Sequence, residues 1–226
     1  MSAQRRPLTF RPKAQLNHHA AGSISGVTAA VTPKGERRRH ALVSAAADLL
    51  CQGGFEAVRH RAVARRAGLP LASTTYYFSS LDDLLVHAVE YAGRNTTERL
   101  RSRVAELARR RRGVEATADV LVELLLDDGA PLQISEELIS RYEIYIACAR
   151  HGWLRDVQRR IRRERMALVV DAMDRCGRVV RGDRLNALMY ALDGAVVAAL
   201  VDDGGNLRST TKAALLGVID VLAPLH

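Results

Sequence analysis

The segment spanning residues 70–78 carries hydroxyl, methyl and phenol groups but no charged side chain, and arginines are frequent in the residues before it. Ser73 and Thr75 offer hydroxyls that donate and accept hydrogen bonds, and Leu71 offers methyl groups for apolar contact. Arginine side chains pair with phosphate or carboxylate oxygens. The pattern predicts contact with a surface that combines anionic groups with hydrogen-bonding edges, as double-stranded nucleic acid does.

The positive charge of the chain is concentrated around this segment. The 226 residues include 34 Lys or Arg and 25 Asp or Glu, a net charge of +9. Residues 1–80 hold twelve basic and three acidic side chains, so the whole excess lies there. A localised excess indicates a polyanionic partner, either nucleic acid or an anionic membrane face. The apolar windows 185–192 and 194–201 are shorter than the ~20 residues that cross a bilayer, so we expect a soluble, cytoplasmic protein with no membrane partner.

Helices are expected to position these side chains, because apolar residues recur at helical spacing from residue 33 onward. The first helix is expected to begin at Pro33 and to stop at Gly53. Two short helices are expected over 59–66 and 70–78, joined by a turn at Gly68. Together they predict a helix-turn-helix unit, in which Thr74 and Phe78 should point into a small core.

The rest of the chain is also expected to be helical. Ser80 with Asp83 predicts a capping box that starts a helix reaching about residue 111. Further helices are expected over 114–126, 134–150, 154–176, 183–201 and 209–221. The predicted fold is all-α with about nine helices, a three-helix head followed by a helical bundle.

Several spaced residues of the first third match a known pattern. Gly54 is followed by Phe55, residues 63–69 read Val-Ala-Arg-Arg-Ala-Gly-Leu, and residues 76–78 read Tyr-Tyr-Phe before an acidic and apolar segment at 82–85. Over about residues 36–85 the chain resembles the TetR family of bacterial transcriptional regulators. It departs from the family pattern at Pro70 and Leu71, where a polar cap and a lysine are common, and at two further positions. These are Val58 and Leu81.

The resemblance implies a DNA-binding transcriptional regulator, most simply a ligand-responsive repressor that binds a palindromic operator as a homodimer. It implies three parts: a flexible basic arm at 1–34, a DNA-binding domain at 35–80, and a ligand-binding and dimerisation domain at 81–226. The partners would be operator DNA, a second copy of the chain and an unknown small-molecule effector. No cofactor, metal or enzymatic activity is expected, because no phosphate loop, HExxH or nucleophile motif occurs in the sequence.

The DNA contacts divide into two groups. Because the segment 70–78 lacks Arg, Lys, Asn and Gln, bidentate base recognition is absent there, and specificity is expected to depend partly on DNA shape. The residues expected to contact bases are Leu71, Ala72, Ser73, Thr75 and Tyr77. The residues expected to contact phosphates are Arg37, Arg38, Arg39, Arg59, Arg61 and Tyr76. Arginines of the arm, Arg5, Arg6 and Arg11, either reach a minor groove or remain solvated.

An effector pocket is expected among the fourth helix and the helices covering 114–150. The candidate lining residues are His87, Tyr91, Tyr142, Tyr145, Cys148 and Trp153, each of which also suits a protein core. Small and apolar residues on the last long helices suit either a dimer interface or the core of one chain, and the symmetry of the expected operator favours the dimer. The candidate interface residues are Val169, Met173, Ala187, Ala191, Gly194, Ala195, Ala198, Leu215 and Ile219.

Two other functions fit parts of the sequence. Cys51, Cys148 and Cys176 are widely spaced and favour buried thiols, although a thiol-redox sensor on the same scaffold remains an alternative. A DNA-compacting protein without sequence preference is the other alternative. Arginine runs at 109–112 and 155–165 lie among balancing acids, so we expect solvated helix faces there and no DNA contact.

Overall fold

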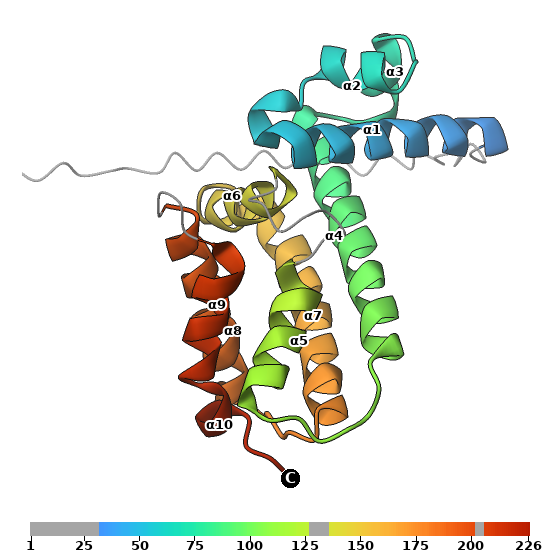
Figure 1. Ribbon diagram of the computed structural model, residues 1–226. Helices are drawn as coiled ribbons and strands as arrows, with labels where there is room; N and C mark the ends of the chain where they lie inside the picture. The colour runs from blue at the N-terminus through green and yellow to red at the C-terminus, as the bar shows by residue number, and fades with distance from the viewer. Residues whose placement is uncertain (1–31, 127–135, 202–205) are drawn as a thin grey trace, which may run out of the picture. The chain divides into compact units, whose positions relative to one another are not determined.

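The computed structural model describes residues 32–126, 136–201 and 206–226 (Figure 1). Ten α-helices and one 3-10 helix form in these ranges, which hold no strand beyond a single antiparallel bridge between Arg178 and Leu225. The all-α prediction is confirmed. The arginines of the expected arm, Arg5, Arg6 and Arg11, lie outside the described residues.

Three helices form the head. Helix α1 (Pro33–Ala57) begins at the predicted proline, and its backbone leaves helical geometry at Gly53 and Gly54, where φ is +61° at Gly54. At the predicted stop, α1 therefore kinks and then continues for one more turn to Ala57. Helices α2 (His60–Arg66) and α3 (Ala72–Tyr77) follow as predicted.

Side-chain capping distinguishes α4 from the two short helices before it. At the start of α4 (Leu81–Glu106), the Asp83 N–H donates to Ser80 Oγ at 3.0 Å, which confirms that half of the capping box. Asp83 Oδ2 accepts from the Ser79 N–H at 2.9 Å, one residue earlier than the usual reciprocal bond. The residues that precede α2 and α3, Arg59 and Leu71, make no side-chain cap. Since helices this short are unstable alone, packing has to hold them in place.

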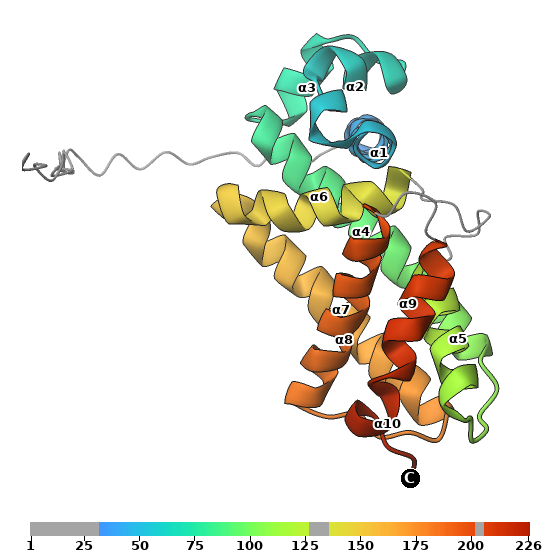
Figure 2. The same cartoon turned by 60° about the vertical axis from the view of Figure 1, so that its left-hand side comes forward.

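Seven further helical segments make up the body. They are α5 (Val114–Leu126), α6 (Glu136–Arg150), the 3-10 helix η1 (Gly152–Leu154), α7 (Arg155–Arg175), α8 (Asp183–Ala199), α9 (Leu207–Leu216) and α10 (Ile219–Leu222). Figures 1 and 2 show α5, α7, α8 and α9 running side by side, with α6 crossing their end beside α1. The single helix expected over 209–221 is divided into α9 and α10 after Gly217. Within the described ranges, no helix is long and apolar enough to span a bilayer.

Two apolar clusters form the interior. The first joins the head to the first turns of α4 and the start of α7, and includes Leu42, Leu50, Val63, Phe78 and Leu84. The second joins the end of α4 to α5–α10, and includes Leu121, Leu138, Met173, Leu192 and Leu215. The core of the head therefore continues into the first half of α4, which makes α4 a shared element of both clusters.

The arginine run at 109–112 departs from the expected solvated helix face. Helix α4 ends at Glu106, and Arg112 is buried, its Nη1 donating to the carbonyls of Ala108 and Arg175 at 3.0 and 3.2 Å. Arg109 pairs with Asp174 across an exposed surface at 2.6 Å. The run is thus a loop held against the end of α7 by arginine donors, a role that charge counting along the sequence does not reveal.

Arg178, just after α7, is the largest fully buried side chain and is 1% exposed. It donates to Thr117 Oγ1 at 3.0 Å, to Asp220 Oδ1 at 2.8 Å and to the Ala223 carbonyl at 2.8 Å. A buried guanidinium is tolerated only when its donors are satisfied. This residue joins the start of α5 to the end of the chain.

Candidate functional site

The α2–α3 unit is held in shape by its inner face. Gly68 adopts φ +64°, and the Leu69 N–H donates to the Ala64 carbonyl at 3.0 Å, which closes the turn between the two helices. Thr74 and Phe78 are buried, as predicted, and Thr74 Oγ1 donates to the Leu71 carbonyl at 2.8 Å. This anchoring fixes which side of α3 faces outward.

The outward side of α3 is uncharged and accessible. Leu71 is 46% exposed and Tyr76 is 80% exposed, and Ala72 and Thr75 are also exposed. Ser73 and Tyr77 are half-buried, and the Tyr77 ring meets the Tyr76 ring edge-on with centroids 4.9 Å apart. The five residues expected to contact bases therefore divide into three at the surface and two at its margin. Their contact with DNA remains a prediction.

The predicted phosphate contacts include residues in two different situations. Arg37, Arg38 and Arg61 are exposed, whereas Arg59 donates to the Val58 carbonyl at 3.3 Å and forms an ion pair with Glu56. Arg39 is turned inward. Its guanidinium lies over the Phe78 ring at 5.2 Å and contacts His87 Nε2 at 2.6 Å. Arg39 thus braces the head instead of facing outward, so its predicted phosphate contact is withdrawn.

His87 lies at the junction between α4 and the head and not in a pocket. Because arginine only donates, Nε2 accepts from Arg39 and the Nδ1 proton is donated to the Asp83 carbonyl at 2.8 Å. The Ser79 N–H bond to Asp83 holds the pKa of that carboxyl below its usual range, and the Ser79 hydroxyl, His87 and Arg39 add to this effect against a smaller effect of burial. Four polar groups thus fix the start of α4 beneath α3.

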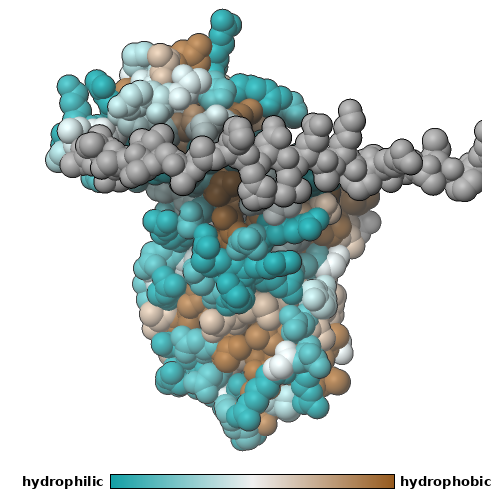
Figure 3. All heavy atoms as spheres, turned by 180° about the vertical axis from the view of Figure 1, so that it is seen from behind, coloured by the Kyte–Doolittle hydropathy of each residue, from teal (hydrophilic) through white to brown (hydrophobic). Residues whose placement is uncertain are grey.

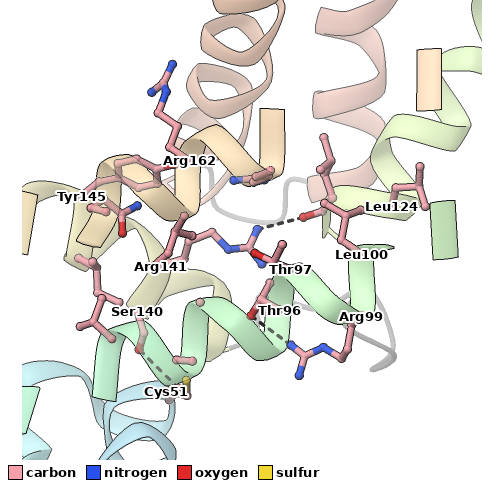
Figure 4. A pocket seen from close by; sticks show the side chains of 18 of the residues that line it. Cys51, Thr96, Thr97, Arg99, Leu100, Leu124, Ser140, Arg141, Tyr145 and Arg162 are labelled. Atoms are coloured by element: carbon pink, nitrogen blue, oxygen red, sulfur yellow. Dashed lines mark hydrogen bonds between the residues drawn. The ribbon is translucent and has the colours of Figure 1, made fainter. Parts of the chain in front are cut away.

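A cavity of about 490 Å³ lies where the two apolar clusters meet, among α4, α5, α6 and α7 (Figure 4). Much of its wall is apolar: Val89, Ala92, Leu100, Leu124, Leu125, Ile144 and Ile161. Threonine and serine hydroxyls and the Gln158 amide interrupt that wall. Five arginines also line it, Arg99, Arg103, Arg141, Arg162 and Arg165, and no acidic side chain does so within the described ranges. Its size and mixed lining are those of a small-molecule site.

Most of the predicted pocket residues lie elsewhere. Tyr145 lines the cavity, but Tyr91 packs edge-on against His40 at 5.4 Å, and Cys148 and Trp153 pack against the core of the head. Tyr142 is buried and donates to Asp193 at 3.0 Å. These four residues and His87 do not line this cavity, and their contact with an effector stays a prediction. Aromatic and soft side chains suit ligand contacts and protein cores alike, and this fold uses them to fill the junction between head and body.

The missed residues are arginines, and α7 shows the signal that could have found them. Val157, Ile161, Val169 and Met173 follow one another at four-residue spacing and face the interior. The position between Ile161 and Val169 is Arg165. An arginine in the middle of an inward-facing apolar stripe is a buried cation. The other arginines of the 155–165 cluster largely form the solvated face that was expected, since Arg155, Arg159, Arg160 and Arg163 are exposed, and Arg165 is the exception.

Arg165 is 8% exposed, and its Nη2 has no hydrogen-bond partner within the part of the chain that the structure describes. Nη2 of Arg162 is likewise buried and without a hydrogen bond there, although the Arg162 guanidinium lies 5.0 Å from the Tyr190 ring. Arg141 Nη1 donates to the Leu125 carbonyl at 3.0 Å. Figure 4 shows Arg141 reaching toward Thr97, whereas Arg162 extends away from Thr96 and Thr97.

Arg165 and Arg141 both lie close enough to Tyr142 to influence its pKa. Burial and then the negative charge of Asp193 raise the pKa of Tyr142, and the positive charges of Arg165 and Arg141 oppose that rise. Tyr142 therefore keeps its proton and donates it to Asp193. Asp193 lies behind Tyr142 and does not line the cavity.

The cavity wall includes the contact between head and body. Helix α1 packs against α4 and α6. Ser140 of α6 donates through Oγ to the Leu50 carbonyl at 2.9 Å and reaches the Cys51 carbonyl at 3.5 Å. Both Ser140 and Cys51 line the cavity. Less than one helical turn of α1 therefore separates the cavity wall at Cys51 from the kink at Gly54.

The cysteines and other soft ligands give no sign of a second site. Burial raises the pKa of both the Cys148 and the Cys176 thiols, which lowers the fraction of reactive thiolate. None of Cys51, Cys148 and Cys176 forms a disulfide. Within the described residues, no group of three or more His, Cys, Asp or Glu side chains could hold a metal ion.

The predicted interface residues fall into two classes. Val169, Met173, Leu215 and Ile219 are buried in the core of a single chain, so they have no surface to offer a second copy and that part of the prediction is corrected. Gly194 and Ala198 are exposed on α8, and Ala187, Ala191 and Ala195 are half-buried. The exposed large apolar side chains near them are Tyr190, Val197, Val201, Leu216 and Val221.

Comparison with known proteins matches both halves of the chain to one family. A sequence model described as bacterial regulatory proteins, tetR family, matches residues 42–88, and one described as tetracyclin repressor-like, C-terminal domain, matches residues 112–221. The HTH-type transcriptional regulator CymR of Pseudomonas putida is 26% identical over 56% of this chain and 59% of its own length. The HTH-type transcriptional regulator PksA of Bacillus subtilis is 28% identical over 50% of each chain. The chain thus spans little more than half the length of these relatives.

Solved structures with the same fold cover more of the chain. The multidrug binding protein EbrR, complexed with imidazole, is 28% identical, with a TM-score of 0.59, and the match covers 79% of this chain and 92% of EbrR. EbrR has also been solved with proflavin and with ethidium. A member of the TetR family from Streptomyces coelicolor A3, SCO1917, is 27% identical, with a TM-score of 0.54, over 79% of this chain and 95% of its own.

Proposed function

The chain belongs to the TetR family of bacterial DNA-binding transcriptional regulators, and on that premise we propose that it is a ligand-responsive repressor that binds a palindromic operator as a homodimer. The observation that carries the proposal is the shared wall between head and cavity. Ser140 of α6 and Cys51 of α1 both line the cavity, and the Ser140 hydroxyl reaches the Cys51 carbonyl. A molecule in the cavity would therefore contact the element that carries the DNA-binding head.

The head supports a division of labour in DNA binding. The uncharged outward side of α3 fits the major groove, where Leu71 and Ala72 can meet thymine methyl groups and the Thr75 hydroxyl can meet base edges. The exposed Arg37, Arg38 and Arg61 supply sequence-independent contacts to phosphates. The proposed DNA-binding domain comprises residues 35–80, and the proposed ligand-binding and dimerisation domain comprises residues 81–226.

The proposed dimer uses α8 and α9. Tyr190, Val197 and Leu216 are exposed apolar side chains on these two helices, next to the exposed Gly194 and Ala198, which allow close helix approach. Figure 3 shows that apolar side chains also gather on the surface of the body below a belt of hydrophilic ones. A pair of chains related by a two-fold axis would present two heads to successive major grooves about 34 Å apart.

Ligand binding would act on the spacing of these heads. A small molecule that prefers one arrangement of α4 and α6 shifts the population toward that arrangement. Because α1 packs on both helices, the heads would leave the spacing that the operator requires. A coupling of about 1–3 kcal/mol releases an operator roughly 5- to 150-fold. The matched EbrR complexes with small molecules support a ligand role for this fold.

Footprinting on the DNA that flanks the protein's own gene tests the proposal, with light scattering to measure the mass of the free protein. We expect one protected palindrome and a protein of twice the chain mass. Leu71→Ala should weaken binding to that palindrome about five- to tenfold and leave binding to unrelated DNA unchanged. Arg38→Gln is the matched control and should weaken both equally. Uniform protection without a discrete site would instead support a compaction protein, and a monomer would refute the dimer.

A further inference from the structure

We propose that the cavity between α4, α5, α6 and α7 binds an organic anion: an oxyanion group held by Arg165 and Arg141, on a body whose apolar part lies against the aliphatic wall. The inference rests on the proposed ligand-responsive function and names the chemical class of its effector.

The first step is the state of Arg165. Its side chain is more than nine-tenths buried, it lines the cavity, and its Nη2 has no hydrogen-bond partner in residues 32–126, 136–201 and 206–226. A guanidinium cannot lose its proton at physiological pH, so burial without a partner leaves both a charge and a donor uncompensated. Buried charges in proteins are paired, which makes a negatively charged occupant the missing partner.

The second step is the sign of the lining as a whole. Among the residues that the structure describes, five arginines line the cavity and no aspartate, glutamate or histidine does. Arg141 is held by its bond to the Leu125 carbonyl, so its guanidinium is already positioned and loses little freedom when a ligand binds. Arginine presents a planar fork that matches carboxylate and phosphate oxygens two at a time. The arginines of the described wall disfavour a cation in the same place.

The third step is the remaining wall, which excludes a small inorganic ion as the occupant. Leu100, Leu125, Ile144 and Ile161 are among the apolar side chains that form much of the wall of the 490 Å³ cavity. An inorganic anion would leave that apolar surface wet, whereas an organic anion of drug size would cover it. Thr97 adds a hydroxyl that can complete the shell of the oxyanion.

The test uses two probes with the same aromatic body. One is 8-anilinonaphthalene-1-sulfonate, which carries an oxyanion, and the other is N-phenyl-1-naphthylamine, which is neutral. We expect the full-length protein to bind one anionic probe per chain, at least about tenfold tighter than the neutral probe. Equal affinity for the two probes would overturn the proposal.

Variants assign the selectivity to the site. Arg165→Met keeps a long side chain but removes its charge. It should weaken binding of the anionic probe about ten- to a hundredfold, while binding of the neutral probe is retained. Retained binding of the neutral probe shows that the cavity is still folded. Arg163→Met is the matched control, because Arg163 is an exposed arginine on the same helix, and it should change neither affinity. Unchanged anion affinity in Arg165→Met would overturn the proposal.

Competition then identifies the oxyanion. Decanoate and decyl phosphate carry the two candidate headgroups on one chain, and decyltrimethylammonium carries a cation on the same chain. Displacement of the anionic probe by either anion supports the proposal and names the headgroup, whereas equal displacement by the cation overturns it. Operator footprinting without any ligand is measured in parallel. A discrete footprint without anion selectivity refutes this inference alone, and anion selectivity without a footprint refutes the proposed function alone.

Discussion

The arginines of the head and those of the body carry the same charge and are used in opposite ways. Arg37, Arg38 and Arg61 of the head are exposed, and the net positive charge of residues 1–80 predicts such a basic surface. The net charge of residues 81–226 is zero, yet Arg165 and Arg178 are buried among them. The comparison teaches that regional net charge reports where a protein meets a polyanion, and it says nothing about cations inside a balanced domain.

The two buried arginines of the body also differ from each other. Arg178 donates to Thr117, Asp220 and a backbone carbonyl, so its charge and its donors are satisfied by the protein. The Nη2 of Arg165 has no such partner in the described part of the chain. A buried arginine whose donors are satisfied by the protein indicates a structural role. A buried arginine with an unsatisfied donor indicates a site for a ligand. The following variants test these distinctions.

The largest effect is expected for Arg178→Met. The change removes the hydrogen bonds that join α5 to the end of the chain and leaves the Ala223 carbonyl without this donor, so the free energy of unfolding should fall by about 3 kcal/mol. Urea unfolding followed by circular dichroism measures it. Arg184→Met, at an exposed position on α8, is the control and should stay within about 0.5 kcal/mol. A similar small loss for Arg178→Met would show that its bonds are dispensable.

Replacing Arg37, Arg38 and Arg61 together by glutamine should change DNA binding and leave the stability of the fold unchanged. Unfolding should be unaffected within about 0.5 kcal/mol, because these side chains are exposed. The slope of log affinity for DNA against log salt should become shallower by about 0.9 for each phosphate that an arginine no longer neutralises. Fluorescence anisotropy at several salt concentrations gives that slope, and an unchanged slope would remove these residues from the interface. The same titration on a chain lacking residues 1–30 tests the contribution of Arg5, Arg6 and Arg11.

Ser140→Ala tests the link between the two regions. Loss of the hydroxyl bond to the Leu50 carbonyl should lower the free energy of unfolding by about 1 kcal/mol. With the anionic probe bound, release of operator DNA should be weaker than in the parent protein, because α6 no longer holds the end of α1. Comparing operator affinity with and without the probe, in both proteins, isolates the coupling. Equal release in both proteins would place the coupling elsewhere.

The smallest effect concerns the pH dependence contributed by Asp83. Its pKa is below the ordinary value of 3.8 in the folded chain, so it stabilises the fold fully above that value and the contribution disappears as the pH falls through the folded value. At pH 6, Asp83→Asn should lower the free energy of unfolding by less than about 1 kcal/mol. The difference from the parent protein should shrink below about pH 4. A difference that persists unchanged at pH 2 would contradict this assignment.

The sequence predicted the head well because its determinants are local. The helix-turn-helix unit follows from apolar spacing, Gly68 and the Ser80 cap, all within a few residues of one another. The buried positions of Thr74 and Phe78 follow from the same spacing. The inward turn of Arg39 could not be predicted, since it depends on His87, 48 residues further along the chain.

The cavity was predicted poorly because its wall is assembled from α4, α5, α6 and α7, with one residue of α1, and the facing sides of these helices are set by tertiary packing. Tyr142 and Tyr145 are three residues apart on α6, and only Tyr145 lines the cavity. The same limit applies to Met173 and Leu215, whose apolar character suits a dimer interface and the chain's own core equally well. The four-residue stripe of α7 was the one readable signal, because Arg165 interrupts it.

Gly93 of α4 lies so close to α7 that a Cβ there would come within 2.3 Å of Ile161 Cδ1. Both residues line the cavity, and neither carries charge. A side chain at position 93 would therefore force Ile161 to shift within the cavity wall. The volume of the accepted molecule and its charge are thereby set by separate residues, so a sensor built on this scaffold can be retuned for size at Gly93 and Ile161 while Arg165 and Arg141 are left as they are.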